Sequence, residues 1–197
     1  INFGATASHV AARSLAFHTP LPDGQILPMS GPATNDAAAP EQLAAMSERL
    51  RSQLDAGALG IGMGIQYTPG ASRSEVIHIF SLAAERGLPV YTHVRSSGRL
   101  DPGSVESVSE VIGAAAVTGA PLHIVHINSS CMKDAPECLS MVAGARARGL
   151  DVTTEAYPYV AGMTMINSAL FNPGWRETFD IDYSDLMLPG SGERLTK

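Results

Sequence analysis

Residues 88–128 read LPVYTHVRSSGRLDPGSVESVSEVIGAAAVTGAPLHIVHIN and contain the pattern that indicates the fold. A short apolar run comes first. A segment with apolar residues at helical spacing follows over residues 104–118 and ends at Gly119. A second short apolar run then begins at Pro121. A strand, a helix and a further strand in this order predict two parallel strands joined by a crossover helix.

The same alternation continues on both sides of this unit. A glycine follows each predicted helix, and glycine is the residue that most readily ends a helix. The pattern predicts five strands, at residues 1–7, 58–66, 88–94, 121–128 and 150–157. It also predicts four helices, at residues 40–56, 72–86, 104–118 and 135–148, and a loop rich in Pro, Gly and Asn at residues 18–40.

Strict alternation of strands and helices indicates an α/β fold with a parallel sheet and right-handed crossovers. Two architectures share this pattern, a doubly wound open sheet and a (β/α)8 TIM-type barrel. Neither GxGxxG nor GxxxxGK[ST] follows a predicted strand, so the usual phosphate signatures of the open sheet are absent. A complete barrel needs about 250 residues. The 197 residues are therefore expected to form part of a barrel.

The composition excludes several classes of protein. Hydrophobic residues make up 45% and charged residues 16% of the chain, which is typical of a folded domain and not of a disordered tail. No apolar run approaches the roughly 20 residues of a membrane span. The net charge of -6 argues against a nucleic-acid partner. The two cysteines are too few for a disulfide scaffold, which favours a cytoplasmic location.

Two histidines come at the ends of neighbouring predicted strands. His93 ends one strand and His126 the next, and one βα unit separates them. Because the carboxyl ends of parallel strands line the site in such folds, the two imidazoles are expected to converge. Neutral imidazoles in a partly open site suit Zn2+. The alternative for each is a hydrogen-bonded structural histidine.

Strand alternation places further polar side chains beside these two. Arg95 shares a face with His93 and is expected to pair with a substrate carboxylate, unless it is a solvated loop residue. Glu155 shares a face with Tyr157 on the last predicted strand, and it could also cap the loop that follows. Asn128 lies on the face that carries the second histidine.

The other histidines and the two cysteines are not expected to bind the metal unless the register of the first strand places His9 in the site. His123 lies on the opposite face of its predicted strand and is expected to pack against a helix. His78 lies inside a predicted helix, and His9 lines the site only if the register of the first strand allows it. Cys131 and Cys138 match no zinc motif and are expected to bind no metal.

Five stretches of the chain together resemble a known family. They read GALGIG at residues 57–62, YTPG at 67–70, YTHVR at 91–95, HIVHINS at 123–129 and TTEAYPYVAG at 153–162. In this order they resemble the N-acyl-D-amino-acid deacylases of the amidohydrolase superfamily, and most of all the branch named D-glutamate deacylase. The resemblance implies a zinc-dependent (β/α)8 barrel with a small β-sandwich, which hydrolyses the amide bond of N-acyl-D-amino acids.

The resemblance also implies which part of that barrel the chain represents. Residues 1–197 are expected to be the central part of one catalytic domain, from barrel strand three to strand seven. A His-x-His pair, a metal-binding Cys and the catalytic Asp are then expected outside the chain, so this segment alone should be inactive. Neither Lys133 nor Lys197 lies on a predicted strand, which disfavours a site where a carboxylated lysine bridges two metals.

The expected mechanism gives each remaining residue a role. Zinc on the two histidines activates a water molecule that attacks the amide carbonyl. The small N-acyl amino acid substrate is expected to contact Arg95, Tyr67 and Tyr157, and the ligands are expected to be oriented by Glu155 and Asn128. Two alternatives stay open: an amidohydrolase that acts on cyclic imides or isoaspartyl peptides, and a non-catalytic binding domain with the same fold.

Overall fold

A five-stranded parallel sheet forms the centre of the computed structural model, which describes residues 3–21, 25, 27–28, 30–98 and 102–196. The strands run in sequential order and are β1 (Ala7–Ser8), β2 (Ile61–Gly64), β3 (Val90–His93), β4 (Leu122–Ile124) and β5 (Val152–Thr154). Every neighbouring pair is parallel. The α/β fold and the parallel sheet predicted from the sequence are confirmed.

The helices follow the predicted pattern closely. The four predicted helices correspond to α3 (Pro40–Asp55), α4 (Arg73–Ala84), α5 (Ser104–Thr118) and α7 (Ala135–Ala147). The sequence pattern missed α1 (His9–Ala16), α2 (Pro32–Asn35), α6 (Ile127–Cys131) and α8 (Trp175–Phe179), and four short 3-10 turns, η1 (Ile65–Tyr67), η2 (Met132–Asp134), η3 (Ala169–Phe171) and η4 (Tyr183–Asp185). A signal for α1 was present, because Ser8 caps the helix by accepting a hydrogen bond from the Ala11 amide at 3.2 Å.

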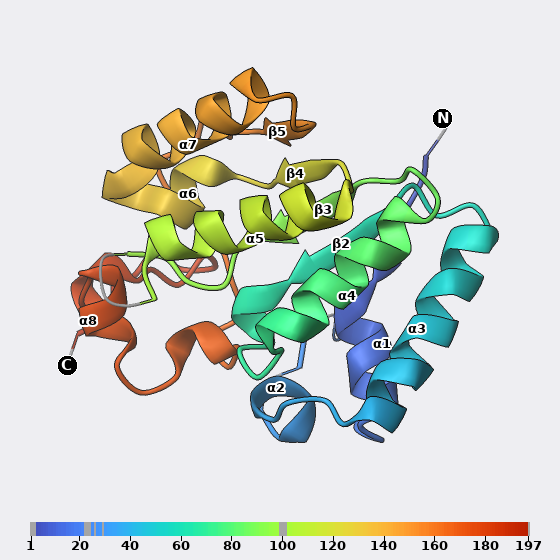
Figure 1. The fold of residues 1–197 in the computed structure, drawn as a ribbon. Helices are drawn as coiled ribbons and strands as arrows, with labels where there is room; N and C mark the ends of the chain where they lie inside the picture. The colour runs from blue at the N-terminus through green and yellow to red at the C-terminus, as the bar shows by residue number, and fades with distance from the viewer. Residues whose placement is uncertain (1–2, 22–24, 26, 29, 99–101, 197) are drawn as a thin grey trace.

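The order of the strands distinguishes the two candidate architectures. Right-handed crossovers that always step in the same direction place every helix on the same face of the sheet. Figure 1 shows α4 and α5 together on one side of the strands, and α4 contacts α5 as α5 contacts α7. A doubly wound sheet would reverse its strand order and carry helices on both faces. The described residues therefore have the topology of five successive strands of a (β/α)8 barrel, with the four crossover connections between them.

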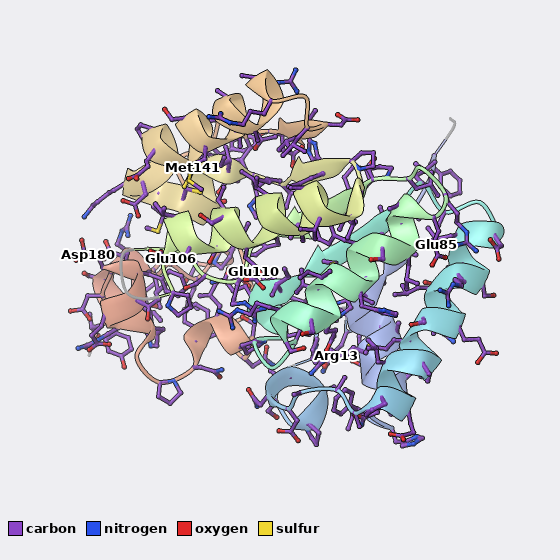
Figure 2. The ribbon with its side chains drawn as sticks, viewed as in Figure 1. Arg13, Glu85, Glu106, Glu110, Met141 and Asp180 are labelled. Atoms are coloured by element: carbon purple, nitrogen blue, oxygen red, sulfur yellow. The ribbon has the colours of Figure 1, made fainter. Side chains whose placement is uncertain are left out.

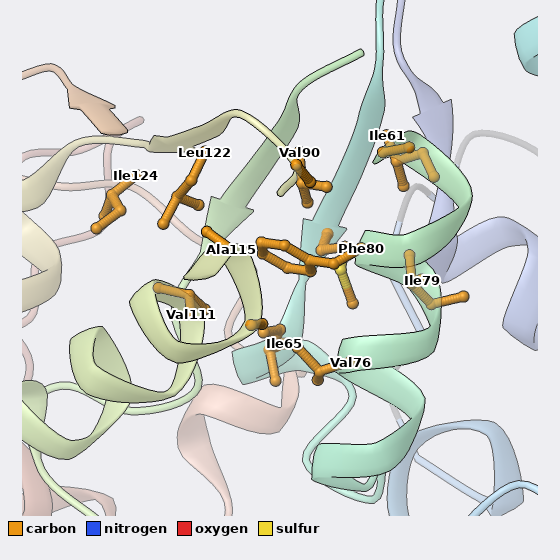
Figure 3. Close-up of a cluster of buried hydrophobic side chains, with 14 of the residues drawn as sticks. Ile61, Ile65, Val76, Ile79, Phe80, Val90, Val111, Ala115, Leu122 and Ile124 are labelled. Atoms are coloured by element: carbon orange, nitrogen blue, oxygen red, sulfur yellow. The ribbon is translucent and has the colours of Figure 1, made fainter. Parts of the chain in front are cut away.

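The hydrophobic core lies between the sheet and these helices. Each central strand directs alternate side chains toward the helices, where Ile61, Val90 and Leu122 are at most 1% exposed. Figure 3 shows them facing Phe80 of α4 and Val111 of α5. Burial of one such side chain contributes roughly 1.5–3 kcal/mol to folding. The core consequently fixes which strand positions face inward, away from these helices, and this determines the site.

The strands are shorter than predicted. The first was expected to span residues 1–7, but its first two positions lie outside the described residues and β1 begins at Ala7. Pairing starts slightly earlier, since the Leu59 amide donates to the Ala5 carbonyl at 2.9 Å. The strands predicted to end at Asn128 and Tyr157 end at Ile124 and Thr154. After β4, apolar residues continue at Val125 and Ile127 although the hydrogen-bonded ladder has ended. In the described part of the chain, every helix is too short or too polar to cross a bilayer.

Candidate metal centre

The candidate site lies at the carboxyl ends of β2, β3 and β4. In parallel α/β folds this edge collects residues from several strands, because every strand ends there. Here β2 leads into η1, β3 ends at His93, and the backbone beyond β4 reaches His126 two residues later. His93 lies on the face of β3 opposite the buried side chains of Val90 and Thr92. The side chain therefore points to the inner face of the barrel segment.

The two histidines meet as the sequence predicts. His93 Nδ1 lies 3.0 Å from His126 Nε2, and the ring centroids are 4.6 Å apart. An ideal tetrahedral zinc site, with Zn–N distances of about 2.05 Å, separates two ligand nitrogens by roughly 3.3 Å. The pair of inner nitrogens thus has nearly the spacing that a shared zinc ion requires.

The outer nitrogens of both rings contact oxygen atoms. His93 Nε2 is hydrogen-bonded to Gln66 Oε1. His126 Nδ1 lies 3.0 Å from Ser130 Oγ and 3.2 Å from Ser129 Oγ. Metal-ligating histidines nearly always have such an oxygen partner on the second ring nitrogen, which holds the ring orientation. By this criterion as well as by spacing, the residues present fit one side of a zinc site.

His126 reaches the site through an unusual backbone conformation. The strand predicted to continue to Asn128 is interrupted here, because His126 has φ 36° and ψ 54° in the left-handed region. This conformation is uncommon for a residue with a Cβ, and it tends to occur at functional sites. It turns the chain into α6, which places Ser129 and Ser130 beneath the imidazole. The Glu155 carboxylate accepts a hydrogen bond from the His126 amide at 3.4 Å.

The environment keeps His93 uncharged. Burial lowers the pKa of His93 to about 3, and the neighbouring His126 adds to this shift. The imidazole is therefore neutral at physiological pH. Neutral imidazole is the form that binds a metal ion.

Tyr67 lies beside the histidine pair. Its ring centroid is 5.2 Å from that of His93. The glycine at position 64 permits this approach, because a Cβ added there would lie 3.0 Å from Tyr67 Cδ2. The predicted site residue Tyr67 is thus brought to the histidines by the turn that ends β2.

Arg95 occupies a different environment from the one predicted. β3 ends at His93, so the alternation that placed Arg95 on the same face does not continue. Its guanidinium lies on the helix side, where Nε and Nη2 donate to the Glu110 carboxylate at 2.8 and 2.7 Å. The other contacts are to the carbonyls of Pro69 at 2.9 Å and Ala71 at 2.8 Å. Figure 2 marks Glu110 on α5. The Arg95 side chain is 5% exposed and its N–H groups donate to these partners. It therefore does not offer a pair of N–H donors to a substrate carboxylate.

The remaining predicted residues join the segment around His126 to the segment beyond β5. Asn128 Nδ2 donates to the carbonyl of Tyr157 at 3.1 Å, which connects α6 to the segment beyond β5. The Tyr157 ring lies 6.3 Å from that of Tyr159. Glu155 accepts from the His126 amide, and its side chain is 57% exposed. Glu155 thus contacts the backbone of a candidate ligand, and Asn128 holds α6, the helix that follows this ligand, to the segment beyond β5.

The prediction for His123 is wrong, and the structure decides the question that the sequence left open for His9. His123 faces the inner side and does not pack against a helix, because its Nδ1 lies 2.8 Å from Thr153 Oγ1 and its ring centroid lies 5.5 Å from that of Tyr91, with the two rings tilted by 56°. The sequence placed it on the wrong face because β4 ends before His126, which breaks the alternation between the two. His9 is fully buried and contacts Glu75 at 2.8 Å, so it does not line the site.

Sequence reasoning missed the residues that hold the imidazoles. Gln66 directly ends a predicted strand, and position alone could have marked it as a site residue. Ser129 and Ser130 come three and four positions after His126, a spacing that brings side chains together only on a helix. The sequence pattern indicated a strand there, so this signal was not visible. Within the described residues no group of three His, Cys, Asp or Glu side chains is arranged to hold a metal ion.

Comparison with known proteins places this arrangement in a family. No protein-family model matches the chain. It is 32% identical over 146 residues to the N-acyl-D-glutamate deacylase of Alcaligenes xylosoxydans xylosoxydans, a match that covers 70% of this chain and 28% of that protein. It is 31% identical over 140 residues to the D-aminoacylase of the same organism, covering 68% of this chain and 28% of that protein. The chain belongs to the N-acyl-D-amino-acid deacylase family.

Solved structures agree with this relationship. The N-acyl-D-glutamate deacylase of Bordetella bronchiseptica, solved with zinc and a phosphonate inhibitor, superposes with a TM-score of 0.63 at 24% identity, covering 81% of this chain and 31% of that one. A D-aminoacylase structure has a TM-score of 0.57 at 29% identity, covering 65% and 27%. This deacylase-family chain thus spans less than a third of the length of the relatives that it matches.

Proposed function

We propose that the full-length protein containing this chain hydrolyses the amide bond of N-acyl-D-amino acids, with a zinc ion held in part by His93 and His126. The observation that carries the proposal is the convergence of the two imidazoles at 3.0 Å, each with an oxygen partner on its outer nitrogen. The metal, when bound, would lower the pKa of a water molecule to about 7 and polarise the amide carbonyl.

The residues of this chain would prepare that chemistry. The neutral state of His93 leaves a nitrogen lone pair for the metal without prior loss of a proton. Tyr67, which packs against His93, is positioned to orient the acyl or side-chain part of the substrate. We assign Tyr157 to the same task, and Asn128 and Glu155 to holding the segment around His126.

The proposal includes parts that lie outside these residues. Residues 1–197 would be the strands three to seven of the barrel, and the other ligands and the catalytic Asp would come from the remaining strands. The incomplete ligand set of the described residues is compatible with this arrangement. Cys131 and Cys138 are free and buried thiols, which supports a reducing, cytoplasmic location.

The substrate is proposed to be an N-acyl-D-glutamate. The support is the match to an N-acyl-D-glutamate deacylase in both sequence and structure comparisons. Because Arg95 is engaged by Glu110, the cation that would bind the substrate carboxylates must be supplied by another residue of the full-length protein.

The test uses the full-length protein and racemic N-acetylglutamate, with chiral chromatography of the glutamate released, with and without a chelator. Chelator-sensitive release of D-glutamate is the expected result. His93→Ala should abolish both activity and zinc retention. His78→Ala is the matched control, because this histidine of α4 lies outside the pair, with its Nε2 atom 2.7 Å from Ser47 Oγ of α3.

Other outcomes would contradict specific parts of the proposal. Release of L-glutamate would overturn the stereochemistry and retain the hydrolase. Activity on cyclic imides or isoaspartyl peptides alone would replace the substrate class. Failure to bind zinc or to hydrolyse any of these substrates would favour a non-catalytic domain.

A further inference from the structure

Gln66 contacts His93 through the ring nitrogen that does not face His126. It lies in η1, directly after β2, and is 7% exposed. Its Oε1 atom is hydrogen-bonded to Nε2 of His93, on the side of the ring that faces away from His126. A buried carboxamide at this point contacts a candidate ligand without occupying the space between the two imidazoles.

The turn that carries Gln66 is held on several sides. The Thr68 amide donates to the Ile65 carbonyl at 3.0 Å, and the Thr68 hydroxyl donates to the Gly64 carbonyl at 3.3 Å. Just beyond, the Gly70 amide donates to the carbonyl of Thr34 at 2.9 Å. The Arg95 guanidinium adds contacts to two carbonyls of the same segment. The backbone that carries the carboxamide is therefore held in place by contacts within the chain.

The chemistry of the contact determines the position of a proton. A neutral imidazole carries one N–H and one lone pair, and a carboxamide oxygen can only accept a hydrogen bond. With Oε1 as its partner, Nε2 of His93 must carry the proton. Nδ1 then presents its lone pair toward His126, where a metal would bind.

We propose that Gln66 is a positioning residue that fixes His93 as its Nε2–H tautomer and so makes Nδ1 the metal-binding atom. The inference rests on the proposed function, since it concerns a ligand of the proposed zinc ion. It distinguishes the two histidines, because Ser129 and Ser130 can either donate to or accept from His126. Gln66 therefore sets the tautomer of His93, whereas Ser129 and Ser130 can hydrogen-bond to either tautomer of His126.

The test compares three variants of the full-length protein. Gln66→Met keeps a side chain of similar volume without an acceptor oxygen, and Gln66→Glu keeps the oxygen. Gln53→Met is the matched control, because the Oε1 atom of Gln53 on α3 is buried and has no hydrogen-bond partner among the described residues. Imidazole 15N NMR of the metal-free proteins above pH 7 reports the tautomer of His93, and chelator competition gives the zinc affinity.

The expected results follow from the geometry. His93 should be the Nε2–H tautomer in the wild-type protein, in Gln66→Glu and in Gln53→Met, and a mixture of tautomers in Gln66→Met. Zinc affinity should fall roughly 10- to 100-fold in Gln66→Met, as for other residues that orient a ligand, and should be retained in the other two. If Gln66→Met does not fold, Gln66→Asn, which withdraws the oxygen by one carbon, replaces it.

The inference would be overturned by a wild-type His93 protonated at Nδ1, or by a Gln66→Met variant with unchanged tautomer and zinc affinity. These failures differ from failure of the proposed function. A wild-type protein that binds no zinc would refute the metal site, while the NMR comparison would still decide whether Gln66 sets the tautomer.

Discussion

Replacement of Arg95 separates a structural role from a substrate-binding role. Its side chain is 5% exposed and that of its partner, Glu110, is 10% exposed. The variant Arg95→Met leaves the Glu110 carboxylate without this cation, and the carbonyls of Pro69 and Ala71 lose the hydrogen bonds that Arg95 donates. We therefore expect a large loss of stability and only a secondary effect on substrate binding.

The magnitude follows from the burial of the pair. Removing one partner of a buried ion pair costs about 3–5 kcal/mol, because the other charge remains buried and uncompensated. Arg73 Nε lies 4.0 Å from Glu110 and offsets part of this cost, so the lower end of the range is expected. The double variant Arg95→Met/Glu110→Met removes both charges and should be more stable than Arg95→Met alone.

The assay is urea-induced unfolding followed by circular dichroism, together with KM for the best substrate found. Arg51→Met is the control, since Arg51 and Glu85 form an exposed pair with side chains 42% and 45% exposed. Figure 2 labels Glu85. That variant should lose less than about 1 kcal/mol. An Arg95→Met protein with an unchanged free energy of unfolding and a raised KM would refute this reasoning and restore the substrate-binding role.

Three further predictions concern acid stability, chain packing and the second histidine. Burial by itself would raise the pKa of Glu75, but the hydrogen bonds and charges of its buried partners hold it below its usual 4.5. The stabilisation is therefore complete above about pH 4.5 and lost as the pH falls through the lower folded value, and Glu75→Gln should flatten this dependence in melting curves from pH 6 to pH 3. Gly70→Ala should lower Tm, because the added Cβ would lie 2.3 Å from the backbone of the α2 segment. Gly113→Ala should raise Tm, because the added Cβ has open space on α5 and alanine favours a helix over glycine. Equal shifts of Tm in the two variants would contradict this. Zinc affinity should fall roughly 10-fold or more in Ser129→Ala/Ser130→Ala and less in either single variant, and an unchanged double variant would show that the serines do not orient their histidine.

The order of helices and strands could be predicted from the sequence because its signals are local. The apolar spacing of residues 104–118 and the glycine that follows predict α5 with the bounds that the structure has. The same reasoning failed for β4, where apolar residues continue past Ile124 although the ladder stops. Hydrogen bonding to a neighbouring strand ends a strand, and periodicity does not report it.

The site could be predicted only in part. The sequence determined that His93 and His126 meet, since parallel strands one βα unit apart must end at the same edge of the sheet. Only the tertiary structure decided the environment of Arg95, because a buried carboxylate from α5 and two backbone carbonyls accept hydrogen bonds from its guanidinium. It also decided the contact of Gln66 with His93, which joins side chains 27 positions apart. Spacing along the chain determines which residues share an edge, whereas the partners of each side chain depend on packing between elements that are distant in sequence.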